Sequence, residues 1–402
     1  MDPRLVAALL LLSVFGIGMI YSAGVVNTPN PTVTEAWMRQ LVWFGIALVA
    51  FTLTARVPLR WWEWAATPGY VLALALLAAT LVIGTGAGTA ASTKSWIAIG
   101  PVRFQPVELA KIATILALGR MLANRDEPPT GLRDMLAPGA MTAVPLGLVL
   151  LQPDLGSALA FVGILFAMLY WAGTPVLMLL LTASPVAGLI LSFDTRIWSG
   201  YIVILFLVLY LYRYRVFLYE SAAVIGVNVA AGAIATPLWN SLEQYQKNRL
   251  LVFLDPQVDP RGAGYHLIQS RVAIGSGGIT GKGFTMGTQK KFDFLPEQHT
   301  DFIFSVIGEE LGFVGVALSL LMFGYVLYRL IRMAEDAPDP FAGLVLFGIF
   351  GAWLVHIFIN IGMTVGIVPV TGIPLPFVSY GGTFLLMSWV AVAIAVRLAH
   401  EE

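Results

Sequence analysis

The chain has 402 residues, of which 58% are hydrophobic and 11% charged, and its mean hydropathy is +0.82. A water-soluble domain cannot bury so much apolar surface, so the composition indicates an integral membrane protein. The 23 basic and 23 acidic residues cancel, which argues against nucleic-acid binding, and the lack of cysteine excludes a disulfide framework, a thiol nucleophile and a cysteine-ligated metal.

Apolar runs of the length that a membrane helix needs, about 20 residues, recur along the chain. No alternating strand pattern of a membrane barrel is found, so we predict an all-helical polytopic membrane protein forming a single domain over residues 1–402. The first run is longer than a signal-peptide core and is expected to be retained. The predicted helices lie near residues 5–26, 37–55, 62–84, 105–122, 136–151, 155–172, 174–193, 197–219, 221–239, 302–328, 341–365 and 377–397.

The basic residues predict the orientation of these helices. If the first helix leaves the cytoplasm and every run crosses, the arginines of the short loops, including Arg213 and Arg215, lie inside, as the positive-inside rule requires. Both termini are then cytoplasmic, and residues 241–301 form one large extracytoplasmic loop in the plasma membrane protein. Ten or twelve helices satisfy this parity. Because ATP is absent outside the cell, any bond made there must use an activated substrate delivered through the bilayer.

The fourth run begins with charged residues. Glu108 and Lys111, three positions apart, share a helical face near the outer end, where an unpaired charge costs on the order of 3 kcal/mol at the bilayer centre. We expect them to pair with each other or with groups across a cavity, and both a structural ion pair and a functional site stay open. Arg103 beside them could hold a lipid diphosphate, because its planar guanidinium matches phosphate oxygens.

Polar residues between the helices have simple structural interpretations. Asp154, in a short outer turn, is placed to cap the following helix, and Asp255 and Asp259 precede prolines, which favours turn capping. His266 and His299 lack the spacing of a zinc site.

Three further segments call for partners or irregular backbone. The glycine-rich residues 275–283 fail the P-loop pattern and predict a flexible surface turn, with a diphosphate cradle as the alternative. Glu309 and Glu310 lie two turns inside the next helix and need partners there. Residues 366–377 contain too much proline and glycine for a helix and predict irregular backbone at the outer surface.

Several of these sequence motifs resemble those of a known protein family. The tail from Asn360 to Thr383, together with the motifs at residues 152–156, 262–266 and 296–302, is similar to the shape, elongation, division and sporulation (SEDS) family, and more to its rod-shape branch than to its division branch. The resemblance spans nearly the whole chain. The chain departs from the family pattern at Val107, at Phe384 and in a surplus apolar stretch within 197–239.

The resemblance implies a ten-helix fold and a peptidoglycan glycosyltransferase that polymerises lipid II at the outer face of the membrane during cell elongation. It implies a class B penicillin-binding protein and other cell-elongation proteins as partners. The essential aspartate of the family falls on Asp255, which replaces the capping interpretation with a catalytic one. Other family positions fall on Glu108, Lys111, Gln152, Asp154, Glu309 and Ser379.

Polymerisation of an α-linked diphosphate sugar into a β-linked glycan requires inversion, and a single displacement needs one base. We expect Asp255 to be that base. The departing diphosphate needs a cation, for which Lys111, Arg103, Arg249 and a bound divalent ion such as magnesium or manganese are candidates. A transporter that flips lipid II and a non-catalytic scaffold for the penicillin-binding protein are the alternative functions.

Overall fold

The computed structural model describes residues 2–28, 30–86, 94–100, 102–212, 218–260, 262–292, 294–295 and 297–399. Arg213, Arg215 and Pro296, which the sequence analysis used, lie outside these residues. Apart from a short hairpin, in which β1 (Ile97–Ile99) pairs antiparallel with β2 (Val102–Phe104), the regular structure described is helical. The predicted all-helical fold is therefore confirmed.

Each predicted membrane run coincides with a helix of the described chain. Seven spans are long and apolar enough to cross a membrane by length and composition, and four further apolar helices are shorter. One more helix, α5, contains Glu108, Lys111 and Arg120. The helices are α1 Pro3–Ala23, α3 Ala36–Thr54 (after the short α2, Pro31–Thr34), α4 Leu59–Ile83, α5 Pro106–Ala123, α6 Leu132–Leu151, α7 Leu155–Trp171, α8 Val176–Leu191, α9 Thr195–Leu211, α10 Leu218–Ser241, α14 Ile303–Glu335, α15 Pro340–Val365 and α16 Gly382–Leu398.

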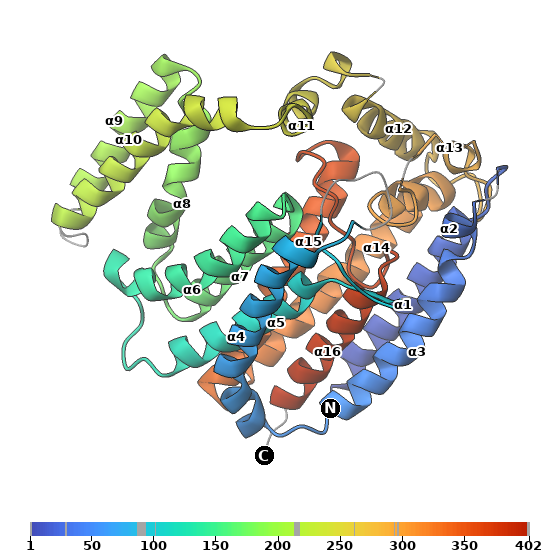
Figure 1. Cartoon of the computed structure of the whole chain (residues 1–402), viewed down its shortest axis with the longest axis horizontal. Coiled ribbons are helices and arrows are strands. Elements are labelled where there is room, and N and C mark those ends of the chain that lie inside the picture. Colours follow the sequence, from blue (N-terminus) through green and yellow to red (C-terminus); the bar gives the residue numbers. More distant parts are fainter. Residues whose placement is uncertain are drawn as a thin grey trace.

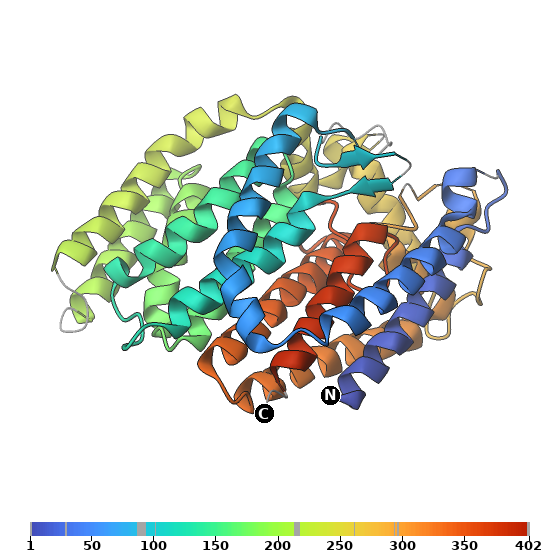
Figure 2. The same cartoon turned by 60° about the horizontal axis from the view of Figure 1, so that its bottom comes forward.

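Helix α15 forms the centre of the bundle. It packs against α5, α7, α14 and α16, while α4 covers α5, and α3 covers α16 (Figures 1 and 2). Its apolar residues extend around the whole helix, as expected for a largely enclosed element, although Leu354 and Phe358 remain exposed. Small residues allow the close contact with α7, since a Cβ at Gly351 would lie 2.4 Å from the Cβ of Ala167.

Helices α8, α9 and α10 lie at one edge of the molecule (Figure 1). They pack mainly against one another, and α8 also contacts α7. The surplus apolar stretch within 197–239 accounts for this edge, because it forms α9 and most of α10. The described chain thus has twelve membrane-scale helices, the larger of the two numbers that the sequence allowed.

The large loop is folded. It contains α11 (Gln244–Leu254), the 3-10 turn η1 (Pro256–Val258), α12 (Ala263–Ser276) and α13 (Thr288–Lys291). Both termini lie at the opposite end of the molecule from this loop (Figures 1 and 2), as an even number of crossings requires. We call the end of the bundle that carries residues 241–301 the loop side.

The segment between α15 and α16, residues 366–381, is irregular as predicted. Its first part reaches the surface, where Ile367 is 64% exposed, but residues 373–379 are mostly buried. Leu375 and Val378 have no exposed surface. Protein groups satisfy its backbone: the Asn360 side-chain amide donates to the Ile373 carbonyl at 2.7 Å, and the Tyr380 amide donates to the loop at 2.9 Å. The segment therefore enters the loop side of the bundle as a packed element.

Candidate active site

Glu108, Lys111 and His356 form an ionic cluster between α5 and α15, near the loop side. Lys111 Nζ lies 2.8 Å from each carboxylate oxygen of Glu108 and 2.9 Å from Nε2 of His356. The exposed fractions are 5%, 5% and 2%. The predicted pairing of Glu108 with Lys111 is confirmed, and His356 is a third partner that the sequence did not indicate.

A cavity of about 30 Å³ adjoins this cluster, large enough for one or two water molecules. All three side chains of the cluster line this cavity. Apart from Ser388, the other lining side chains, from α5, α15 and α16, are apolar, Trp353 and Phe384 among them. The cavity therefore places a charged group next to apolar side chains.

Asp255 lies outside this cavity, in the large loop. It ends α11 and begins η1, where its Oδ1 accepts a hydrogen bond from the Gln257 amide at 2.9 Å. The capping interpretation drawn from composition is therefore correct as far as it goes. The Asp255 side chain is exposed, so a large polar substrate can reach it without any change in the core.

A second group of charged residues surrounds Asp301, just before α14. Burial, reinforced by the negative charges of Glu297 and Asp154, raises the pKa of the Asp301 carboxyl to about 7, and Arg249 on α11 opposes the shift. Within the described residues this carboxyl accepts no hydrogen bond, and a Cβ at Gly372 would lie 3.2 Å from its Oδ2. A carboxyl that titrates near neutral pH can exchange a proton with a bound substrate.

The two loop histidines belong to separate packing contacts. Burial, with Arg39 nearby, lowers the pKa of His299 to about 4, and burial together with Arg249 lowers the pKa of His266. His266 stacks on Phe302 at a ring distance of 6.0 Å. In the described chain no three His, Asp or Glu side chains gather as metal ligands. A divalent ion held by one or two carboxylates together with the diphosphate itself needs no such group.

Gln152 and Asp154 hold the turn between α6 and α7. The Gln152 side-chain amide donates to the Leu77 carbonyl at 3.0 Å and to Thr80 Oγ1 at 2.5 Å, which ties the turn to the end of α4. Asp154 Oδ1 accepts from the Ser157 amide at 2.9 Å, so the predicted cap of α7 is confirmed.

Ser379 ties segment 366–381 to the large loop. Its Oγ donates to the Thr300 carbonyl at 2.6 Å and accepts from the Leu375 amide at 2.8 Å, and the side chain is 2% exposed. Arg103 and Arg249 differ from it, because both are exposed on the loop side, Arg103 on β2 and Arg249 on α11. The structure thus makes the two arginines accessible to an anion in solution and encloses Ser379.

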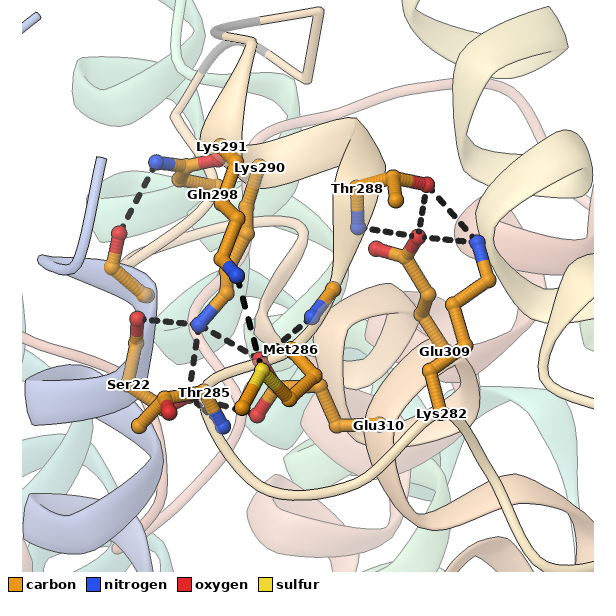
Figure 3. Close-up of polar contacts among 12 residues, drawn as sticks. Ser22, Lys282, Thr285, Met286, Thr288, Lys290, Lys291, Gln298, Glu309 and Glu310 are labelled. Atoms are coloured by element: carbon orange, nitrogen blue, oxygen red, sulfur yellow. Dashed lines mark hydrogen bonds and ion pairs between the residues drawn. The ribbon is translucent and has the colours of Figure 1, made fainter. Parts of the chain in front are cut away.

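Glu309 and Glu310 fasten the large loop to the start of α14. Glu309 accepts from Lys282 at 2.7 Å, and Glu310 lies 2.5 Å from Lys290 (Figure 3). The hydroxyl of Ser22, at the end of α1, donates to the second oxygen of Glu310 at 2.5 Å. Both carboxylates have no exposed surface, and the expectation that they need partners is confirmed.

The glycine-rich residues 275–283 are neither a flexible surface turn nor a cradle with amides open to a ligand. Four backbone bonds of 2.9–3.1 Å join this stretch to α14, two in each direction. Gly281 has a φ of +79°, and a Cβ there would lie 2.1 Å from the Glu310 carbonyl oxygen. Glycine is needed here for close packing, and the amides of Gly281, Lys282 and Gly283 are already bonded to backbone carbonyls.

Known proteins resemble the chain over nearly its whole length. The family model described as "Cell cycle protein" and labelled FTSW_RODA_SPOVE matches residues 3–222 and 195–402. Peptidoglycan glycosyltransferase MrdB of Escherichia coli K12 is 35% identical over 400 residues, which cover 99% of this chain and 93% of the relative. Peptidoglycan glycosyltransferase RodA of Treponema pallidum is 34% identical and is covered to 98%.

The chain belongs to this family. A chain of a peptidoglycan synthase complex that coordinates polymerization and crosslinking superposes with a TM-score of 0.72 at 29% identity, covering 99% of this chain and 97% of that one. The crystal structure of Thermus thermophilus rod shape determining protein RodA gives 0.63 at 26% identity, covering 99% and 96%.

In this SEDS chain the family motifs meet on the loop side and bond to one another. The Asn360 side-chain amide donates to the Asp301 carbonyl at 3.0 Å, and Ser379 donates to the neighbouring Thr300. Motifs far apart in the sequence thus build one rigid support under the large loop.

Two residues of the candidate site could not be singled out from the sequence. His356 is a lone ionisable side chain in an apolar run, which is a functional signal by default in a membrane helix. Asp301 was read only as part of a motif, and nothing in the sequence indicates that Asp154 and Arg249 lie near it. Phe384, noted as a departure from the family, lies against His356 with a ring distance of 5.1 Å.

Proposed function

We propose that this SEDS protein polymerises lipid II into glycan strands on the loop side, which faces the outside of the plasma membrane, during cell elongation. The observation that supports this most directly is the match over nearly the whole chain to peptidoglycan glycosyltransferases, MrdB and RodA among them. Lipid II supplies its own leaving group, a polyprenyl diphosphate, so the reaction needs no ATP.

Asp255 acts as the general base in this proposal. It takes the proton from the attacking 4-hydroxyl as that oxygen bonds to the anomeric carbon and the bond to the diphosphate breaks, with inversion. In a single displacement the nucleophile and the leaving group lie on opposite sides of the sugar ring. The proposal therefore requires the base and the cation to lie on either side of the same bound sugar, with the base within hydrogen-bond reach of the attacking hydroxyl.

Lys111 is the proposed partner of the diphosphate. Negative charge develops on the leaving oxygen, and a positioned cation in a low-dielectric site stabilises it more than water does. Arg103 and Arg249 are exposed on the loop side and would contact the headgroup beyond the membrane surface. Glu108 positions Lys111, while Gln152 and Asp154 hold the turn between α6 and α7 and Ser379 holds segment 366–381 against the large loop.

A class B penicillin-binding protein is the proposed partner that crosslinks the strands. The similarity to a chain from a peptidoglycan synthase complex supports this pairing. Membrane lipids surround the remaining apolar surface.

The decisive experiment incubates purified protein with lipid II in detergent and measures glycan chain length. Wild type should form polymer, and Asp255→Asn should lower the rate about 10²–10⁴-fold, the usual contribution of a general base. Asp259→Asn is the matched control, because it removes a carboxylate before a proline in the same loop and should leave the rate near that of wild type. Polymerisation by Asp255→Asn at the wild-type rate would exclude it as the base, and lipid II flipping without polymer would favour the transporter.

A further inference from the structure

The position of Lys111 is not determined by its own helix. Glu108 lies one turn before it on α5, and a pair three residues apart leaves the long lysine side chain free to take several directions around the helix. His356 comes from α15 and bonds the ammonium group at 2.9 Å from the facing helix, and all three side chains line the cavity. His356 therefore selects the direction in which the cation points.

The hydrogen bonds of His356 fix its state. The Pro374 carbonyl, 3.2 Å from Nδ1, can only accept, so Nδ1 carries the hydrogen and donates it. Nε2 then has a lone pair and accepts from Lys111, which stays an ammonium ion. The imidazole is neutral in this arrangement, and both of its nitrogens are used.

Phe384, on α16, contacts both His356 and Lys111. Its ring stacks on His356 with 24° between the planes and lies under the Lys111 ammonium at 5.3 Å from the ring centre. An ammonium ion over an aromatic face gains about 0.5–2 kcal/mol. Three helices thus converge on one cation, and through Pro374 the irregular segment 366–381 is joined to it as well.

We propose that His356 is a positioning residue that holds Lys111 toward the cavity, so that the ammonium meets the diphosphate of the lipid substrate. The inference rests on the proposed function for the identity of the substrate. With Lys111 directed at the cavity, its positive charge lies beside apolar side chains, where it attracts the ionic end of a lipid anion more strongly than it would in water. Without His356 the ammonium would face mainly Glu108, whose negative charge offsets its own.

The test measures binding of polyprenyl diphosphate, which lacks the sugars, to purified protein in detergent. His356→Leu should weaken binding about tenfold, as expected from the loss of one hydrogen bond to a charged group. His356→Gln, whose amide oxygen can accept from Lys111, should restore most of it. Wild-type affinity in the leucine variant, or equal loss in the glutamine variant, would overturn the proposal.

A double-mutant cycle separates positioning from a general packing effect. In a Lys111→Met background, His356→Leu should change the affinity no further, because its effect passes through the ammonium group. An equal loss in both backgrounds would show that His356 acts independently of Lys111. If His356→Leu does not fold, Phe384→Leu keeps the apolar volume and should weaken binding about fivefold through loss of the ring face; unchanged binding would contradict the proposed arrangement.

Kinetics connect the result to catalysis. With lipid II, His356→Leu should raise KM more than it lowers kcat, whereas Asp255→Asn should lower kcat. If wild type binds polyprenyl diphosphate with the predicted dependence on His356 but forms no glycan, the polymerase proposal fails and the positioning role stands. If glycan forms and His356→Leu matches wild type in KM and in diphosphate binding, the positioning role fails alone.

Discussion

Two buried ionic clusters on the loop side have similar composition and different surroundings. Around Glu309 and Glu310, three of the four carboxylate oxygens are bonded to lysines, Ser22 or loop amides, and the cluster fixes the large loop to α14 and α1. Around Lys111 the partners are one carboxylate, one neutral imidazole and one aromatic ring, next to a cavity. Buried charge alone therefore does not identify a site. A functional site also needs a cavity beside the charged group and a bonding partner that a substrate can replace.

We call the cluster around Glu309 and Glu310 the closed cluster. Removal of Lys290 from it should have the largest effect on stability. Lys290→Met leaves Glu310 buried without its cation, and breaking a buried pair typically costs about 3–5 kcal/mol. Thermal unfolding in detergent measures the loss. Lys291→Met, at the exposed neighbouring position, is the control and should change little. A Lys290 variant as stable as the control would mean that the closed cluster does not hold the loop.

We call the cluster around Lys111 the open cluster. Replacing Lys111 with methionine should lower the stability less than Lys290→Met does and should weaken substrate binding more. Lys111→Met should destabilise by about 1–3 kcal/mol, because the adjoining cavity allows water to reach Glu108. Binding of polyprenyl diphosphate should weaken but stay measurable, and polymerisation should be lost. Equal destabilisation of the two methionine variants, with activity kept at position 111, would remove the distinction between the clusters.

The pH dependence of stability at Asp301 is a further test, with a smaller expected effect. Its pKa of about 7 in the fold lies above the ordinary value of 3.8, so the folded state keeps a proton that the unfolded chain releases. Its contribution to stability is then complete below pH 3.8 and decreases as the pH rises through 7. Asp301→Asn should stabilise the protein relative to wild type by on the order of 1 kcal/mol above pH 7, with no difference near pH 4. Thermal unfolding at pH 4.5 and pH 8 measures this, and a pH-independent difference would contradict the raised pKa.

Most of the helices were accessible from the sequence because a membrane helix is defined by a local property, the length of an apolar run. The pairing of Glu108 with Lys111 was accessible for a similar reason, since residues three apart on a helix are neighbours. The contact of Lys111 with His356 spans 245 positions, and no local pattern specifies it. The glycine-rich stretch was misread because its composition is the same for a mobile turn and for a backbone packed against another backbone.

The backbone junction between residues 278–283 and α14 has a practical consequence for labelling. Gly312, at a φ of +62°, interrupts the helix, and the stretch beside it is bonded to the helix on both sides of this break. One inserted residue would shift the register of these bonds and place a Cβ where the backbones touch. The glycine-rich composition suggests a place to insert an epitope tag or a fluorophore, but for this reason an insertion here should disrupt the packing of the loop.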